Sequence, residues 1–168
     1  MRFVRVLAVF VSFACASLAL VAAAPPAFAQ DLDLDWKTAD GQVLKSETLD
    51  LKALDTLPQA TIKTSTPWTQ GVQTFSGPTL SAIAALGGRP VKEADVVALN
   101  DYSIVIPAQD WKKYTVVLAS RHNGATMRVR DKGPLWVIYP LDTFSELEKQ
   151  ETNARMVWQV AHITFVVE

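Results

Sequence analysis

Short stretches in which apolar and polar residues alternate make up most of the chain after residue 30. Alternation with a period of two places every second side chain on one face, as in a β-strand with one buried side. This pattern and β-branched content predict strands at 31–36, 41–51, 60–66, 72–75, 95–99, 102–106, 115–119 and 156–167. The segment 135–139 is apolar throughout, which predicts a strand buried on both faces.

Few segments have helical spacing, and all of them are short. Thr79 is suited to cap a helix whose apolar residues Leu80, Ile83 and Leu86 share one face and which ends at Gly87-Gly88. Helical turns are also predicted at 51–57 and 107–114, and one within the polar segment 140–153. Asn100-Asp101 and Asn123-Gly124 are turn-forming pairs between predicted strands. These elements predict an α+β domain with β-rich mixed sheets and short helices, without internal repeats.

The first 29 residues have the pattern of a secretory signal peptide. Arg2 and Arg5 precede an apolar run over 6–24, and Ala27-Phe28-Ala29 offers small residues at a cleavage site, so the mature chain would begin at Gln30. The alternative is a membrane anchor, because the run is close to the length that spans a bilayer. Pro25-Pro26 and the cleavage site favour the signal peptide. We therefore expect one domain over 30–168, in the periplasm, without direct membrane insertion after cleavage.

Charge and cysteine content narrow the classes of function. Residues 30–168 have a formal charge of −3, since two of the 16 basic residues and none of the 17 acidic residues lie in 1–29. Such a balance gives no reason to expect nucleic acid as a partner. Cys15 is the only cysteine, and its position in the signal excludes a thiolate ligand or nucleophile from the mature chain. Only His122 and His162 supply imidazoles, and they form no spaced ligand set.

Four segments in order resemble the molybdopterin-binding domain of the sulfite oxidase superfamily. They are FSGPTL followed by IAALG over 75–87, NDYSIVIP over 100–107, LASRHNG over 118–124 and RDKGPLWVIYP over 130–140. The resemblance implies the fold of that domain. It also implies that Tyr102 occupies the position of the family's active-site tyrosine, and that 130–140 corresponds to its cofactor loop.

The chain departs from the family at two positions that bind the cofactor. The family's oxidoreductases bind molybdenum through a cysteine after the strand that corresponds to 60–66, where this chain has Ser65, Thr66 and Pro67. A hydroxyl is not a soft thiolate donor. Trp136 stands where the enzymes tend to have an arginine suited to the cofactor's phosphate. The resemblance therefore implies a reduced pterin as ligand and disfavours molybdopterin.

Several residues are candidates for contacting such a ligand. Trp68 follows a rigid Ser-Thr-Pro turn and offers a flat face for stacking and one N–H donor, although it is equally suited to closing the core. Trp136 fits the core better because its strand is apolar. Asp131 can accept the adjacent donors of a pterin edge, with Lys132 beside it, but the triplet 130–132 is also typical of a charged surface turn.

The remaining candidates are weaker. Tyr102 is also an ordinary residue at a turn into a strand. Arg121 and Arg155 are candidates for contacting an anion, or are ends of surface elements. His122 is expected to be solvated in a hairpin turn, and Trp36, Trp111 and Trp158 are assigned to packing. Ser65 and Thr66 are the last two candidates for contacting the ligand.

Three functions stay open at this stage. The resemblance favours a periplasmic pterin-binding adaptor that regulates a membrane-bound signalling protein, either a diguanylate cyclase or phosphodiesterase or a histidine kinase. In that mechanism the ligand stabilises the conformation that the partner's periplasmic domain recognises. The alternative is a molybdopterin-dependent oxidoreductase of the superfamily. The third is a structural or assembly protein with a vestigial pocket.

Overall fold

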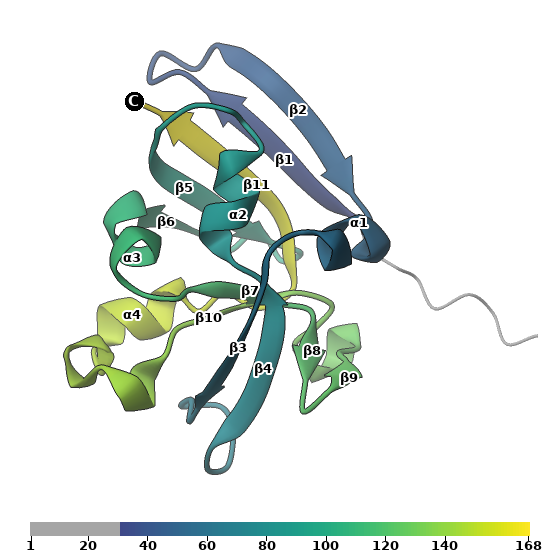
Figure 1. The fold of residues 1–168 in the computed structure, drawn as a ribbon, viewed down its shortest axis with the longest axis vertical. Helices are drawn as coiled ribbons and strands as arrows, with labels where there is room; N and C mark the ends of the chain where they lie inside the picture. The colour runs from purple at the N-terminus through teal and green to yellow at the C-terminus, as the bar shows by residue number, and fades with distance from the viewer. Residues whose placement is uncertain (1–30) are drawn as a thin grey trace, which may run out of the picture.

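The computed structural model describes residues 31–168, and the signal peptide expected over 1–29 lies outside them. A mixed sheet of five strands forms one half of the domain, in the order β2 (Val43–Leu49), β1 (Leu32–Lys37), β11 (Val160–Val167), β5 (Val91–Ala98) and β6 (Ser103–Pro107). The β1 and β11 strands are parallel, and their neighbours are antiparallel. Figure 1 shows this sheet above the rest of the molecule.

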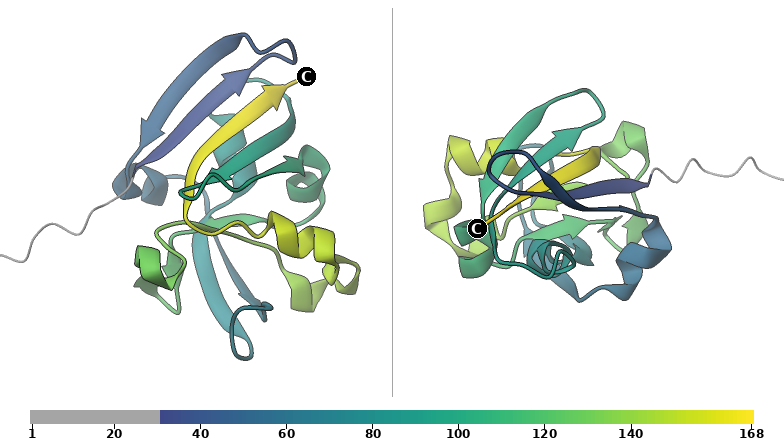
Figure 2. Two further views of the ribbon diagram at one scale, coloured as in Figure 1. Left: turned by 180° about the vertical axis from the view of Figure 1, so that it is seen from behind. Right: turned by 90° about the horizontal axis from the view of Figure 1, so that it is seen from above.

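A second sheet of four strands projects away from the first. Its order is β3 (Gln59–Thr64), β4 (Gln73–Pro78), β8 (Arg121–His122) and β9 (Ala125–Thr126). The left view of Figure 2 shows the long β3–β4 hairpin extending below the five-stranded sheet. Between the two halves, β7 (Val117–Ala119) pairs with β10 (Trp136–Ile138), and every residue of both strands is buried. The prediction of a strand buried on both faces is confirmed.

Short helices cover the flanks of the sheets. Asp50 caps α1 (Leu51–Thr56), and Thr79 caps α2 (Leu80–Ala85) through a bond that its hydroxyl accepts from the Ala82 amide. The others are α3 (Ala108–Lys113), α4 (Gln150–Arg155) and the single turns η1 (Val129–Asp131), η2 (Leu141–Thr143) and η3 (Ser145–Leu147). None of the helices within 31–168 is long and apolar enough to span a membrane.

The core follows the alternation in the sequence. Leu32, Leu34 and Trp36 of β1 are buried, and the residues between them are less so. Trp36 stacks on Phe165 of β11 with ring centroids 5.5 Å apart, and its indole N–H donates to the Ala84 carbonyl at 3.0 Å. These contacts attach α2 to the five-stranded sheet.

Gly77 allows β4 to approach β7 closely. A Cβ added at this residue would lie 2.1 Å from the carbonyl oxygen of Leu118 and 2.9 Å from the Cα of Ala119. The atoms that the added Cβ would meet belong to the backbone of β7, so no flexible side chain could move away from it. The glycine of the FSGPTL segment is thus required by packing between strands.

The last predicted strand begins later than expected. The segment 156–167 was expected to be extended throughout, but β11 begins at Val160. Gln159 interrupts it with a left-handed backbone (φ 56°), and the residues before it run beside β10 through an isolated bridge between Trp136 and Trp158. Residues 156–159 therefore lie at the junction of the two halves, where they contribute to the cavities described next.

Candidate functional site

Three indole rings meet at the junction between the two halves of the domain. Trp68, from the β3–β4 loop, lies 5.0 Å from Trp158 and 6.2 Å from Trp136 between ring centroids. The Trp136 and Trp158 rings are 6.3 Å apart and nearly perpendicular. Edge-to-face contacts at these distances are favourable aromatic geometry. The cluster joins segments that are far apart in the sequence and forms the wall of two cavities.

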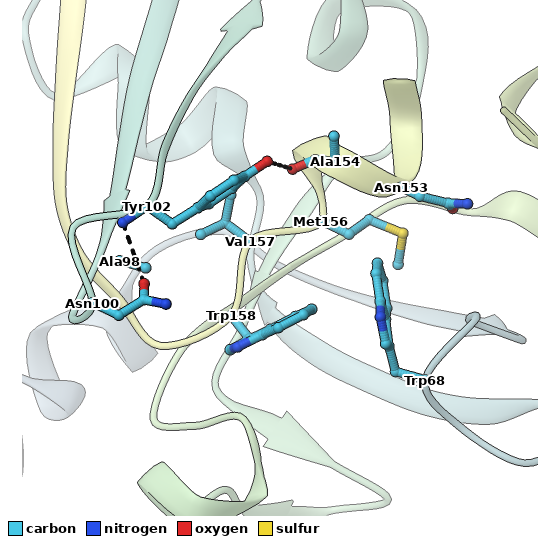
Figure 3. Close-up of a pocket in the computed structure, with 9 residues that line it drawn as sticks. All are labelled: Trp68, Ala98, Asn100, Tyr102, Asn153, Ala154, Met156, Val157 and Trp158. Atoms are coloured by element: carbon cyan, nitrogen blue, oxygen red, sulfur yellow. Dashed lines mark hydrogen bonds between the residues drawn. The ribbon is translucent and has the colours of Figure 1, made fainter. Parts of the chain in front are cut away.

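The smaller cavity measures about 250 Å³ and is mainly apolar. It lies between the β5–β6 turn, the end of α4 and the segment leading into β11 (Figure 3). Its lining comprises three aromatic residues, four apolar residues and two amides: Trp68, Tyr102, Trp158, Ala98, Ala154, Met156, Val157, Asn100 and Asn153.

The larger cavity measures about 700 Å³ and carries charged groups. It lies between the β3–β4 loop, the β8–β9 hairpin and η1, and is lined by Trp68, Thr69, His122, Ala125, Thr126, Met127, Arg128, Asp131, Lys132 and Trp136. This volume falls within the range of small-molecule sites in proteins. Trp68 lines both cavities, with 36% of its surface exposed.

Lys132 lies over the tryptophan cluster. Its ammonium nitrogen is 5.1 Å from the centroid of Trp158 and 5.9 Å from that of Trp136, within the range of cation–π attraction. The residue has a left-handed backbone (φ 69°), which turns the chain at the end of η1. Within 31–168, no carboxylate lies at ion-pair distance from Lys132. Its charge is therefore available to a ligand in the larger cavity.

Asp131 lines the same cavity but already has a partner. Its carboxylate accepts a bond from the guanidinium of Arg128 at 2.6 Å, and both side chains are about half exposed. An exposed ion pair of this kind contributes about 0–1 kcal/mol. A ligand with adjacent donors would therefore displace Arg128 at low cost.

Trp136 and Tyr102 occupy different environments. Trp136 lines the larger cavity but is only 1% exposed, and its N–H donates to the Met156 carbonyl at 3.0 Å. The alternative interpretation of Trp136 as a core residue is thus the better description. Tyr102 is 44% exposed, lines the smaller cavity and donates its hydroxyl to the Ala154 carbonyl at 3.1 Å.

Ser65 and Thr66 line neither cavity in the described part of the chain. Ser65 donates both its amide, at 2.9 Å, and its hydroxyl to the carboxylate of Asp142, so that it attaches the end of β3 to η2. These bonds, the hydroxyl's first, lower the pKa of Asp142. The Thr66 hydroxyl bonds to that of Thr69 at 2.9 Å and accepts from the Trp68 amide at 3.2 Å. Thr66 therefore orients Trp68.

The two predicted arginines are engaged elsewhere. Arg121 pairs with Asp55 at 2.7 Å and donates to the Ser120 hydroxyl at 2.9 Å. Arg155 donates to Asp110 at 3.1 Å, and the same carboxylate oxygen accepts from the Tyr139 hydroxyl at 2.7 Å. Desolvation, followed by the charge of Asp110, raises the pKa of Tyr139 far above its ordinary value. Neither arginine lines a cavity of the described chain.

His122 and Trp158 were not predicted as site residues, yet each of them lines one of these cavities. His122 was expected to be solvated in a hairpin turn; instead it lies in β8, stacks on Phe75 at 4.8 Å and bonds to the Gln73 side chain at 3.1 Å. Trp158, assigned to packing, is a wall of the smaller cavity as well. The pairing of β8 with β4 places His122 against Phe75, and this long-range contact has no signal in the local sequence.

A molybdenum centre of the kind that the resemblance implies requires a thiolate ligand from the protein. Ser65 and Thr66 stand where the resemblance would place that thiolate, and their hydroxyls are bonded within the protein. Among residues 31–168, no group of three or more histidine, cysteine or acidic side chains is arranged to bind a metal. The side chains of residues 31–168 therefore do not fit a molybdenum cofactor that is bound through a protein thiolate.

The arrangement of strands and helices is the mixed α+β fold of the sulfite oxidase type. Among solved structures, the chain is similar to the sulfane dehydrogenase SoxCD from Paracoccus pantotrophus, with a TM-score of 0.59 and 19% sequence identity. The match covers 83% of this chain and 39% of that chain, so this chain spans about two fifths of its length. No protein-family model and no curated protein matches the sequence. The prediction of the fold is confirmed.

Proposed function

We propose that this protein is an exported adaptor that binds a reduced pterin in the larger cavity and regulates a membrane-bound signalling protein. The observation that carries the proposal is one cavity bounded by an indole, a carboxylate and an ammonium group, at a site without a thiol. Trp68, Asp131 and Lys132 supply these groups. The fold of SoxCD, a sulfane dehydrogenase, supports a site of this architecture but not a particular ligand.

The chemistry of the cavity matches the parts of a pterin. A pterin ring is flat and stacks on an indole, while its 2-amino and N3–H groups are adjacent donors that one carboxylate accepts together. Trp68 and Asp131 provide these two features. Lys132 favours an oxygen-bearing or anionic substituent of the ring. These roles of Trp68, Asp131 and Lys132 are the proposal's own assignment.

Regulation follows from binding if the ligand changes the conformation of the cavity wall. Asp131 and Lys132 belong to η1 and its C-terminal turn, and Arg128 of the same segment is released when the ligand takes its place at Asp131. A partner that contacts the ligand-bound form of this segment gains affinity by linkage. We assign that role to the periplasmic domain of a diguanylate cyclase, a phosphodiesterase or a histidine kinase.

The first experiment measures the content of the native protein. Protein purified from the periplasm is analysed for molybdenum by elemental analysis and for pterin by the fluorescence of an oxidised extract. Stoichiometric pterin without metal supports the adaptor. Stoichiometric molybdenum refutes it in favour of an oxidoreductase. Absence of both, together with no binding of added 6-methyltetrahydropterin, refutes it in favour of a vestigial pocket.

Variants then test the residues. Asp131→Asn removes the charge that accepts the two ring donors, and Trp68→Ala removes the stacking surface, so each is expected to weaken 6-methyltetrahydropterin binding about tenfold or more. Glu151→Gln on the exposed side of α4 is the matched control for the loss of one carboxylate. Lys132→Gln removes the ammonium group and should also weaken pterin binding. Lys52→Gln, at an exposed residue of α1, is its control. Equal affinity of Asp131→Asn and Glu151→Gln would contradict the assignment of the ring edge to Asp131.

The signalling role has a separate readout. Deletion of the gene is expected to change the cellular concentration of cyclic di-GMP or the activity of a histidine-kinase reporter. The native gene should restore it, and the Trp68→Ala gene should not. Restoration by a variant that has lost pterin binding would refute regulation through the ligand.

A further inference from the structure

We propose that the smaller cavity is a second binding site, which takes one uncharged, flat aromatic molecule and is distinct from the pterin site proposed above. It is bounded by the rings of Trp68, Tyr102 and Trp158, as Figure 3 shows. This second site is inferred from the lining and volume of the smaller cavity alone, so it does not depend on pterin binding in the larger one.

The lining selects against charge. No acidic residue, lysine, arginine or histidine is among its nine residues; the polar side chains are the Tyr102 hydroxyl and the Asn100 and Asn153 amides. An ionised ligand that moved from water into this cavity would find no charged residue in the lining to pair with, and burying an unpaired charge is costly. The neighbouring cavity differs sharply, since Arg128, Asp131 and Lys132 line it. The two cavities therefore suit ligands of different polarity.

The volume selects for size. An apolar cavity of about 150 Å³ is enough to bind benzene, whereas sites for drug-sized molecules begin at about 300 Å³. At about 250 Å³, the smaller cavity lies between these values. One ring or two fused rings fit it.

The walls are fixed by hydrogen bonds within the protein, so the site is formed before a ligand arrives. The Tyr102 hydroxyl donates to the Ala154 carbonyl at 3.1 Å, and the Tyr102 amide donates to the Asn100 side chain at 3.3 Å. The backbone of Gln159 holds the β5–β6 turn, since its carbonyl accepts from the Leu99 backbone amide at 3.0 Å, and its own backbone amide donates to the Lys132 carbonyl at 3.2 Å. Preformed walls reduce the entropy lost on binding.

The test uses indole as the probe, with indole-3-acetate and tryptamine as its anionic and cationic relatives. Binding to the full protein is measured by calorimetry and by ligand-observed NMR. We expect saturable binding of indole and at least about tenfold weaker binding of both charged relatives, because no charged residue lines the smaller cavity. No saturable binding of indole, or equal binding of the three probes, would overturn the proposal.

A filling variant assigns the binding to this cavity. Ala154→Leu adds a side chain to the lining from α4, where leucine is nearly as good a helix former as alanine. Ala85→Leu, exposed at the end of α2, is the matched control. Indole binding should be lost in Ala154→Leu and kept in Ala85→Leu. If Ala154→Leu does not fold, Tyr102→Ala, which removes a half-exposed wall, takes its place. Binding that neither variant weakens would overturn the assignment.

A competition experiment separates this proposal from the function proposed above. Indole should still bind when 6-methyltetrahydropterin is saturating, and Asp131→Asn should weaken the pterin without abolishing indole binding. The second site would be overturned if indole and the pterin excluded each other, if Ala154→Leu abolished the binding of both and if Asp131→Asn affected neither. Those results would show that the pterin occupies the smaller cavity. Indole binding without any pterin binding would refute the proposed function and leave the second site intact.

Discussion

Asp110 is predicted to stabilise the fold through its bond to Tyr139, and this bond is measurable on its own. The Tyr139 residue is fully buried, and its hydroxyl donates to Asp110 at 2.7 Å. Asp110→Ala leaves that hydroxyl without its acceptor, at a cost of about 1–3 kcal/mol. The guanidinium of Arg155 also loses its partner, but this side chain is 27% exposed and can turn to water. We therefore expect a total loss of about 2–3 kcal/mol.

The companion variant Tyr139→Phe removes the donor instead. It leaves Asp110 paired with Arg155 and is expected to cost about 1 kcal/mol. In the double variant no hydroxyl is orphaned, so its cost should fall at least about 1 kcal/mol short of the sum of the single costs. Urea denaturation of the three variants and the native protein gives the four free energies of unfolding. Additivity within about 0.3–0.5 kcal/mol would refute the account of this network.

Three further predictions follow from single contacts. Gly77→Ala should destabilise the protein by about 1–3 kcal/mol, since the added Cβ meets the backbone of β7, and Ser76→Ala on the same strand should be close to neutral in the same denaturation assay. Ser65→Ala should raise the pKa of Asp142 towards its ordinary value in an NMR titration. The stabilisation that Asp142 gives is present above the pKa of the unfolded state and is lost as pH falls through the pKa of the folded state. The variant should therefore lose less stability than the native protein when the pH is lowered. The free energy of unfolding should fall above about pH 10, because a tyrosine ionises there in the unfolded chain while Tyr139 stays protonated in the folded protein. Tyr139→Phe should make this fall smaller, as measured by denaturation between about pH 9 and 11.

The elements of the fold were predictable because local pattern and long-range packing agree. In β1 the alternation of Leu32, Leu34 and Trp36 matches the buried face, and Thr79 caps α2 as its position before an apolar helix indicates. The single turn η1 was missed, since three residues are too few for a periodic signal. The start of β11 was also misplaced, because Gln159 adopts a left-handed backbone, and a glutamine in the sequence does not indicate one.

The candidate site was predictable in part. Trp68 and Asp131 line the larger cavity, and the resemblance pointed to both. Ser65 was chosen because the resemblance implies the family's cysteine at its position, and Arg155 was chosen for its charge. Their partners Asp142 and Asp110 are 77 and 45 residues away in the sequence. Pairings at such separation are set by the topology of the chain and have no local pattern. The same reason explains why Trp158 was missed as a cavity wall.

The position of Trp68 determines which variants can distinguish the two cavities. Its ring belongs to both walls, so Trp68→Ala is expected to weaken ligands in either cavity and does not locate them. Ala154 lines the smaller cavity alone and Asp131 the larger one alone, so substitutions at these residues separate the sites. A shared wall also provides a route for coupling, because a ligand that shifts the Trp68 ring in one cavity changes the wall of the other. Such coupling is reciprocal by thermodynamic necessity, so indole must alter the affinity for 6-methyltetrahydropterin by the same factor as the pterin alters that for indole.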